Sequence, residues 1–143
     1  MTNATMTTFG FPDTLVRQYD QWVVLVRPAQ VTLGSLVLVS TSESTAFGDL
    51  PEGAHGELGT VIPDIERALR DFVAYQKINY LMLMMVDPHV HFHVLPRYPG
   101  SRTWGGLELT DAGWPGPPEL KSAMAIDPAL QTALRDEIAA LLG

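Results

Sequence analysis

Residues 89–97 read His-Val-His-Phe-His-Val-Leu-Pro-Arg, and three of the four histidines of the chain fall in the first five of these positions. Successive side chains of an extended strand point to opposite faces of its sheet. The alternation therefore predicts a strand whose imidazoles share one face while Val90, Phe92 and Val94 line the other. An apolar back and an imidazole front are typical of a core strand that carries a reactive face. Imidazole titrates near neutral pH, so it can act there as nucleophile, base or acid.

Two other interpretations of the histidine segment stay open. A strand with histidines on its solvent face would show the same alternation without any chemistry. A metal site is the second alternative, because His-x-His on a strand can supply two ligands. Residues 89 and 93 lie about 13 Å apart along an extended strand, so all three imidazoles cannot converge on one ion. A zinc site would need further ligands, and the chain offers only His55 and carboxylates, since it has no cysteine. We expect a site without a metal or another cofactor.

The segment resembles the signature of the histidine triad (HIT) family. Residues 89–95 fit the pattern His-x-His-x-His followed by two further residues, with hydrophobic residues at x. Pro96-Arg97 also follows the pattern of many members, including the fragile histidine triad branch. The resemblance covers most of residues 13–97. It implies a HIT-like fold, a homodimer, and nucleotidyl hydrolysis or transfer at the α-phosphate of a nucleoside polyphosphate or a nucleotide conjugate.

The resemblance also implies a role for each histidine. His91 corresponds to the nucleophile, which would form a covalent nucleotidyl-histidine that water then cleaves. His93 corresponds to the residue that contacts the phosphate oxygens and assists the leaving group. His89 is expected to support the nucleophile, with its backbone carbonyl or its ring fixing the tautomer of His91. Backbone N–H groups of the strand could neutralise phosphate charge without any Lys or Arg.

Two departures from the family pattern bear on activity. Many members place a further histidine directly after the glycine that opens the third strand, where this chain has Gly34-Ser35. Serine can donate a hydrogen bond but cannot titrate. Many members also carry a Gly-Gln-containing loop before the triad, whereas Val86-Asp87-Pro88 is expected to close that connection tightly. These departures keep open the alternative of a non-catalytic module on the same fold that binds a nucleotide or a partner.

Five residues are predicted to contact the substrate. Arg27 stands where relatives have a ribose-contacting asparagine, and it could reach a phosphate or a hydroxyl group or lie on the surface. Leu25 and Val37 could line a base pocket, although core packing explains them equally well. Arg97 could help to bind phosphate, and a structural ion pair is its alternative. Ser35 completes the set as a hydrogen-bond donor.

Composition and charge limit the remaining possibilities. At 143 residues we expect one domain. The net charge of −7 disfavours a nucleic-acid partner, because proteins bind that backbone with Lys and Arg. The first ten residues lack the basic start and apolar core of a secretory signal, and no run approaches the roughly 20 apolar residues of a membrane-spanning helix. With no cysteine, these features predict a cytoplasmic protein without a membrane partner, and they do not exclude the small nucleotide that the resemblance implies.

The order of elements predicts an α+β fold in which about five antiparallel strands carry one long helix and a C-terminal helix. The long helix is expected from about residue 54 to 77, with Pro63 kinking or dividing it. Asp127 and Pro128 are typical of the start of the C-terminal helix over 127–142. Residues 1–12 are expected to be flexible, and 98–126 to be irregular and rich in Pro and Gly. The other predicted strands lie at 14–19, 22–26, 35–40 and 79–86, and the methionines of the last one (Met82, Met84 and Met85) are expected to fill the core.

Overall fold

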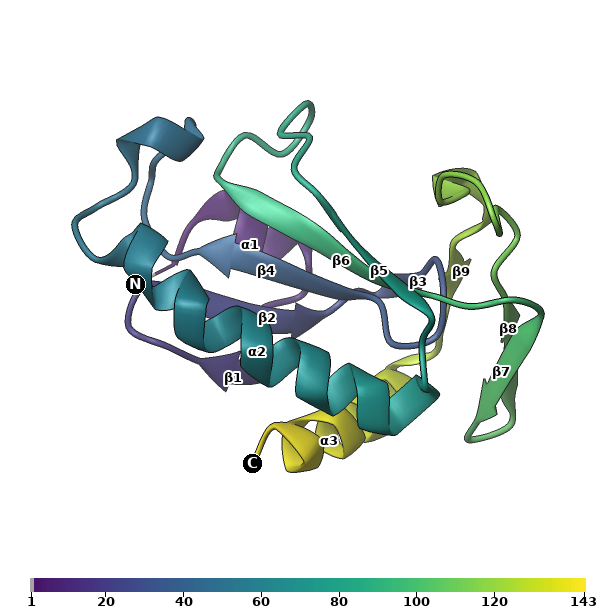
Figure 1. Ribbon diagram of the computed structural model, residues 1–143. Helices are drawn as coiled ribbons and strands as arrows, with labels where there is room; N and C mark the ends of the chain where they lie inside the picture. The colour runs from purple at the N-terminus through teal and green to yellow at the C-terminus, as the bar shows by residue number, and fades with distance from the viewer. Residues whose placement is uncertain (1) are drawn as a thin grey trace.

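A five-stranded antiparallel sheet forms the centre of the structure, a computed structural model that describes residues 2–143 (Figure 1). Its order is β1-β2-β4-β6-β5, so the histidine strand β6 lies inside the sheet and β5 lies at an edge. This arrangement confirms the predicted α+β class. The strands are β1 (Leu15–Gln18), β2 (Trp22–Val26), β4 (Leu36–Ser40), β5 (Lys77–Leu81) and β6 (His91–Arg97).

Helices α2 (Ala54–Val73) and α3 (Pro128–Leu142) cover one face of the sheet. The apolar stripe of α2 brings Val61, Ile65 and Leu69 onto the strands, and all three side chains are fully buried. Pro63 lies inside α2 without dividing it, and the helix ends at Val73 rather than near residue 77. Asp127 caps α3 through a hydrogen bond from the Leu130 N–H, with Pro128 in the first turn, as predicted.

The opposite face of the sheet carries a short helix, α1 (Ala4–Thr8), which lies behind the sheet in Figure 1. The segment expected to be flexible is therefore helical from Ala4, and Met1 lies outside the described residues. The amide of Asn3 donates to the carbonyl oxygens of Ser40 and Ser42, at 2.8 Å each. Met6 is fully buried against four strand residues, namely Val23, Leu25, Val37 and Val39. These contacts hold α1 on the sheet.

The connection that precedes the histidine strand differs from the prediction. Strand β5 ends at Leu81 rather than at residue 86, so nine residues, 82–90, join it to β6. The tight closure expected at Val86-Asp87-Pro88 is therefore wrong. Of the three methionines expected to fill the core, Met82 and Met84 are partly buried against it, whereas Met85 is 85% exposed and the neighbouring Val86 is 90% exposed. Figure 1 shows this connection projecting beyond the end of the sheet.

The segment expected to be irregular contains three short strands. A hairpin joins β7 (Ser101–Trp104) to β8 (Leu107–Thr110), and β9 (Met124–Ala125) pairs with β3 (Ala29–Gln30). A 3-10 turn, η2 (Leu120–Ser122), precedes β9, and another, η1 (Phe47–Asp49), precedes α2. The pairing of β3 with β9 places the segment that precedes α3 beside β3, which begins two residues after Arg27.

Candidate active site

The sheet places His91 and His93 side by side on the α1 face. Their ring centroids lie 5.1 Å apart with the rings nearly perpendicular, at 82°. Val90, Phe92 and Val94 belong to the core on the α2 face, which confirms the predicted alternation. Both imidazoles are largely covered, with exposed fractions of 2% for His91 and 8% for His93. Two buried imidazoles in van der Waals range thus lie at the centre of the candidate site.

A single backbone contact sets the chemistry of His91. Its Nδ1 atom lies 2.7 Å from the backbone carbonyl oxygen of His89. A carbonyl oxygen can only accept a hydrogen bond, so Nδ1 carries the proton. The second ring nitrogen, Nε2, then holds a free lone pair. This is the tautomer that a nucleophilic imidazole requires, and it is the arrangement that the resemblance implied for the carbonyl of His89.

The ring of His89 lies apart from the other two. His89 precedes β6, and its Nδ1 contacts the hydroxyl of Thr5 at 2.9 Å while its Nε2 contacts a carboxylate oxygen of Glu43 at 3.0 Å. Both ring nitrogens therefore have protein partners. The side chain of His89 offers no free nitrogen to a substrate, and what it contributes must pass through its backbone.

His93 faces the guanidinium group of Arg27. The Nε atom of Arg27 donates toward Nδ1 of His93 over 3.4 Å, a long contact for a hydrogen bond. Burial, followed by the nearby charges of Arg27 and His91, lowers the pKa of His93 to about 4. At neutral pH His93 is therefore uncharged, and with Nδ1 facing a donor its proton lies on Nε2. The residue can offer one N–H hydrogen bond to a ligand.

Arg27 is a cation without an acidic partner in the described part of the chain. Its guanidinium donates to the carbonyl oxygen of Ala29, and none of the ion pairs within residues 2–143 includes it. Burial lowers the pKa of Arg27, although the group stays protonated. A half-buried guanidinium beside two imidazoles is a suitable partner for a phosphate.

A cavity of about 280 Å³ joins these groups. On the sheet side, Arg27, His91 and His93 line this cavity. Phe9, the residue that follows α1, also lines it, and the centroid of its ring lies 5.7 Å from that of His91 and 5.5 Å from that of His93. Apolar side chains of the β5–β6 connection and of η2 form the rest of the wall, namely Leu83, Met84, Met85, Val86 and Leu120, together with the carboxylate of Asp87. The cavity thus combines a polar floor with an apolar rim.

Three predicted substrate contacts lie away from this cavity. Leu25 and Val37 share the histidine face but are fully buried beneath Met6, so their placement fits the core-packing alternative. Ser35 is also fully buried, and its hydroxyl donates to the carbonyl oxygen of Thr32 and accepts from the Thr32 N–H. That hydroxyl closes the turn before β4, which leaves no free donor there for a substrate.

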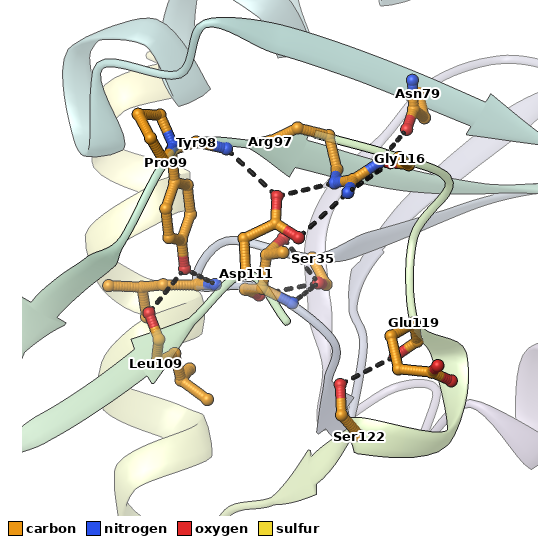
Figure 2. Close-up of polar contacts among 12 residues, drawn as sticks. Ser35, Asn79, Arg97, Tyr98, Pro99, Leu109, Asp111, Gly116, Glu119 and Ser122 are labelled. Carbon is orange, nitrogen blue, oxygen red and sulfur yellow. Dashed lines mark hydrogen bonds and ion pairs between the residues drawn. The ribbon is translucent and has the colours of Figure 1, made fainter. Parts of the chain in front are cut away.

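Arg97 is held in a structural network, which corrects its expected role at the phosphate. Figure 2 shows the carboxylate of Asp111 between the guanidinium of Arg97 and the backbone N–H of Tyr98. Arg97 donates to both oxygens of Asp111, at 2.7 and 3.0 Å, and also to Asn79 and the carbonyl oxygen of Gly116. Its side chain is 3% exposed. This buried ion pair fastens the C-terminal segment to β6.

Four features of the site were missed by sequence reasoning. Thr5, Phe9 and Glu43 contact the histidines, and the apolar residues of 83–86 line the cavity. Asn3, an effective N-cap residue, was the one available signal for α1. The amino-acid types of the other residues do not predict that they lie at the site, because only long-range packing brings them there.

The described chain contains neither a candidate metal centre nor a candidate membrane-spanning helix. Among residues 2–143, no three side chains of His, Cys, Asp or Glu lie close enough together to hold a metal ion. No helix in the same range has the length and apolar character that crossing a membrane requires.

Comparison with solved structures identifies the fold as that of histidine triad proteins. A histidine triad protein from Bradyrhizobium japonicum is 19% identical with a TM-score of 0.71, covering 100% of this chain and 98% of that protein. A histidine triad (HIT) protein from Sinorhizobium meliloti is 16% identical with a TM-score of 0.74, covering 96% and 93%. A hypothetical histidine triad nucleotide-binding protein from Sulfolobus tokodaii is 15% identical with a TM-score of 0.67, covering 96% and 89%. No family model matches the sequence, and no curated protein matches it either.

Proposed function

We propose that this protein is a HIT-type nucleotide hydrolase or nucleotidyltransferase that acts through a nucleotidyl-histidine on His91. The observation that carries the proposal is the 2.7 Å contact from Nδ1 of His91 to the carbonyl oxygen of His89, which leaves Nε2 as a free nucleophile. The fold shared with histidine triad proteins, one of them described as nucleotide-binding, supports it. The His-x-His-x-His signature and the trailing Pro96-Arg97 support membership of the family and its fragile histidine triad-like branch.

The reaction has two steps. The lone pair of His91 Nε2 attacks the α-phosphorus in line, so that a P–N bond forms while the bond from phosphorus to the leaving group breaks. Water then attacks the same phosphorus and the P–N bond breaks. The imidazole is restored, the nucleoside monophosphate is released as product, and one water proton passes to solvent. In the transferase version another nucleophile takes the place of water.

His93 is assigned to the stabilisation of charge. Because its pKa is about 4, it is neutral at physiological pH and offers a hydrogen bond rather than a proton. Leaving groups that depart as stable anions need no proton, and the phosphate chain of a nucleoside polyphosphate is of this kind. The guanidinium of Arg27 is assigned to the phosphate oxygens, whose charge would supply the partner that Arg27 lacks within the described chain.

The proposal includes a homodimer. Strand β5 ends the order of the sheet, so one side of its backbone pairs with no other strand of the described chain. Such an edge is a ready site for strand pairing with a second copy, and the resemblance to the HIT family implies a dimer. Sedimentation at micromolar concentration is expected to give twice the mass of one chain, and a mass near 15.7 kDa would refute the dimer.

A non-catalytic module on the same fold is the second candidate. Two observations favour it: the Ser35 hydroxyl is engaged in its own turn, and His91 is only 2% exposed beneath Phe9. Such a module would bind nucleotide in the same cavity without forming a covalent adduct. Trapping the intermediate therefore separates the two candidates.

The test uses purified protein with nucleoside triphosphates and adenylyl conjugates labelled at the α-phosphate. After denaturation in base, the proposal predicts label on the wild-type protein that acid removes, since a P–N bond is acid-labile. The His91→Ala variant should carry none. The control is His55→Ala, because His55 is exposed and contacts the carbonyl oxygen of Phe47, away from the cavity. Tight nucleotide binding with neither adduct nor turnover would favour the non-catalytic module instead.

A further inference from the structure

The N-terminal helix is fastened to the residue that supplies the carbonyl for His91. Thr5, on α1, is 1% exposed and contacts His89 twice. Its Oγ1 accepts a hydrogen bond from the backbone N–H of His89 at 3.3 Å, and it lies 2.9 Å from Nδ1 of the His89 ring. One hydroxyl therefore holds both the backbone and the side chain of His89.

The third contact fixes the tautomer of His89. The carboxylate of Glu43 can only accept, so Nε2 of His89 carries a proton and donates it over 3.0 Å. In the neutral ring, Nδ1 then has the lone pair and accepts from the Thr5 hydroxyl. The Thr5 hydroxyl thus donates to the ring of His89 and accepts from its backbone N–H, so both of these hydrogen bonds go to one residue.

These contacts form a continuous path to the nucleophile. Glu43 and Thr5 orient His89, and the carbonyl oxygen of His89 accepts a hydrogen bond from Nδ1 of His91. A rotation of the peptide that follows His89 would move this oxygen away from His91 and free its ring to change tautomer. The anchoring of α1 by Asn3 and Met6 keeps Thr5 in place for this task.

The geometry points to Thr5 and Glu43 as positioning residues for His91, acting through His89. This inference rests on the proposed function, because it assigns to α1 a part in the same site. Thr5 is expected to carry the larger share, since its hydroxyl is buried. The side chain of Glu43 is 71% exposed, and contacts of exposed charged groups contribute little. Neither side chain touches the cavity, and neither is a catalytic residue.

The test is nitrogen NMR of the imidazoles, which requires no activity. In the wild type we expect His91 protonated at Nδ1 and His89 protonated at Nε2, each as a single tautomer. Thr5→Val keeps the shape of the side chain but removes the hydroxyl, and it should give His91 a mixture of tautomers. Thr5→Ser should restore the wild-type spectrum. Thr8→Val is the matched control, because Thr8 lies on the same helix with its hydroxyl on the Ala4 carbonyl.

Glu43→Ala is the second variant, and it keeps the inference testable if Thr5→Val fails to fold. Loss of this exposed acceptor should shift the ring nitrogens of His89 toward a mixed tautomer. If the wild type turns over nucleotide, Thr5→Val should lower kcat about tenfold, with KM nearly unchanged, and Thr5→Ser should recover it. An unchanged His91 spectrum in Thr5→Val would overturn the inference. If Thr5→Val does not fold, an unchanged His89 spectrum in Glu43→Ala would overturn it. Altered spectra in a protein without turnover would uphold the positioning path and instead count against the proposed function.

Discussion

The Nε atom of Arg27 lies 3.4 Å from Nδ1 of His93, so a permanent cation faces a histidine at the floor of the cavity. If the proposed function holds, this pair is how an acidic protein would bind phosphate with few basic residues. It also makes the protonation of His93 depend on Arg27, which several measurements can detect.

Removal of the charge on Arg27 should raise the pKa of His93. In Arg27→Gln the charge is lost while burial, the largest cause of the low pKa, remains. We therefore expect the pKa of His93 to rise from about 4 but to stay below the ordinary 6.5. An NMR titration of the His93 ring measures this directly, with Arg17→Gln as a control at a guanidinium that does not line the cavity. Identical titration curves for wild type and Arg27→Gln would contradict the assigned coupling.

The same pKa makes stability depend on pH with a definite sign. His93 titrates at about 4 in the folded chain and near 6.5 when unfolded, so the unfolded state binds more protons between these values. The contribution of His93 to the free energy of unfolding is fully present above pH 6.5. It is lost as the pH falls toward 4, which lowers that free energy by up to about 3 kcal/mol. Urea unfolding from pH 4 to 7 measures it when wild type is compared with His93→Asn. Curves that stay parallel over this range would rule out the effect.

Loss of the nucleophile should separate chemistry from binding. His91→Ala removes Nε2 and is expected to abolish turnover and the covalent adduct. The variant loses the hydrogen bond to His89 and the buried contacts with Phe9 and His93, at a cost to stability of roughly 2–4 kcal/mol. Calorimetric titration with a nucleoside monophosphate should give nearly wild-type affinity. Turnover within a few-fold of wild type would remove His91 from the role proposed for it.

The strand pattern predicted the central part of this site well. Alternation alone places His91 and His93 on one face and Phe92 on the other, because the side-chain period of a strand is fixed. The five-stranded α+β class likewise follows from the order of apolar segments. Both are local properties of the chain, so they can be predicted without knowledge of the tertiary packing.

What surrounds the histidines could not be predicted in this way. Helix α1 spans only five residues, Ala4–Thr8, too few to show a helical period, and its contacts with Ser40 and His89 cross 37 and 84 positions of sequence. The predicted strand before the triad is too long: it ends at residue 86, whereas β5 ends at Leu81. The apolar run 83–86 is largely exposed but has the composition of a buried strand. For Arg97 the sequence leaves both a phosphate contact and a structural ion pair open, because its partner, Asp111, lies in a segment without a regular pattern.

The ion pair between Arg97 and Asp111 should be important for stability. Their side chains are 3% and 1% exposed, so Asp111→Ala would leave a buried guanidinium with lost partners. We expect a loss of about 3–5 kcal/mol in the free energy of unfolding by urea. The exposed pair Arg135–Asp136 is the control, and Asp136→Ala should cost less than about 1 kcal/mol. Similar small losses in both variants would show that the buried network is not what fastens the C-terminal segment.

Two methionines should respond in opposite ways to truncation. Met6 belongs to α1 and is fully buried against the sheet, so Met6→Ala is expected to cost about 2–5 kcal/mol in the free energy of unfolding. Met85 is 85% exposed, so Met85→Ala should change that free energy by less than about 0.5 kcal/mol. Because Met85 lines the cavity, its loss should weaken nucleotide binding by roughly 3- to 10-fold instead, through lost apolar contact. Urea unfolding and calorimetric titration of the two variants measure both quantities. A destabilised Met85→Ala would mean that the 82–90 connection packs into the core, and unchanged binding would remove its apolar rim from the ligand site.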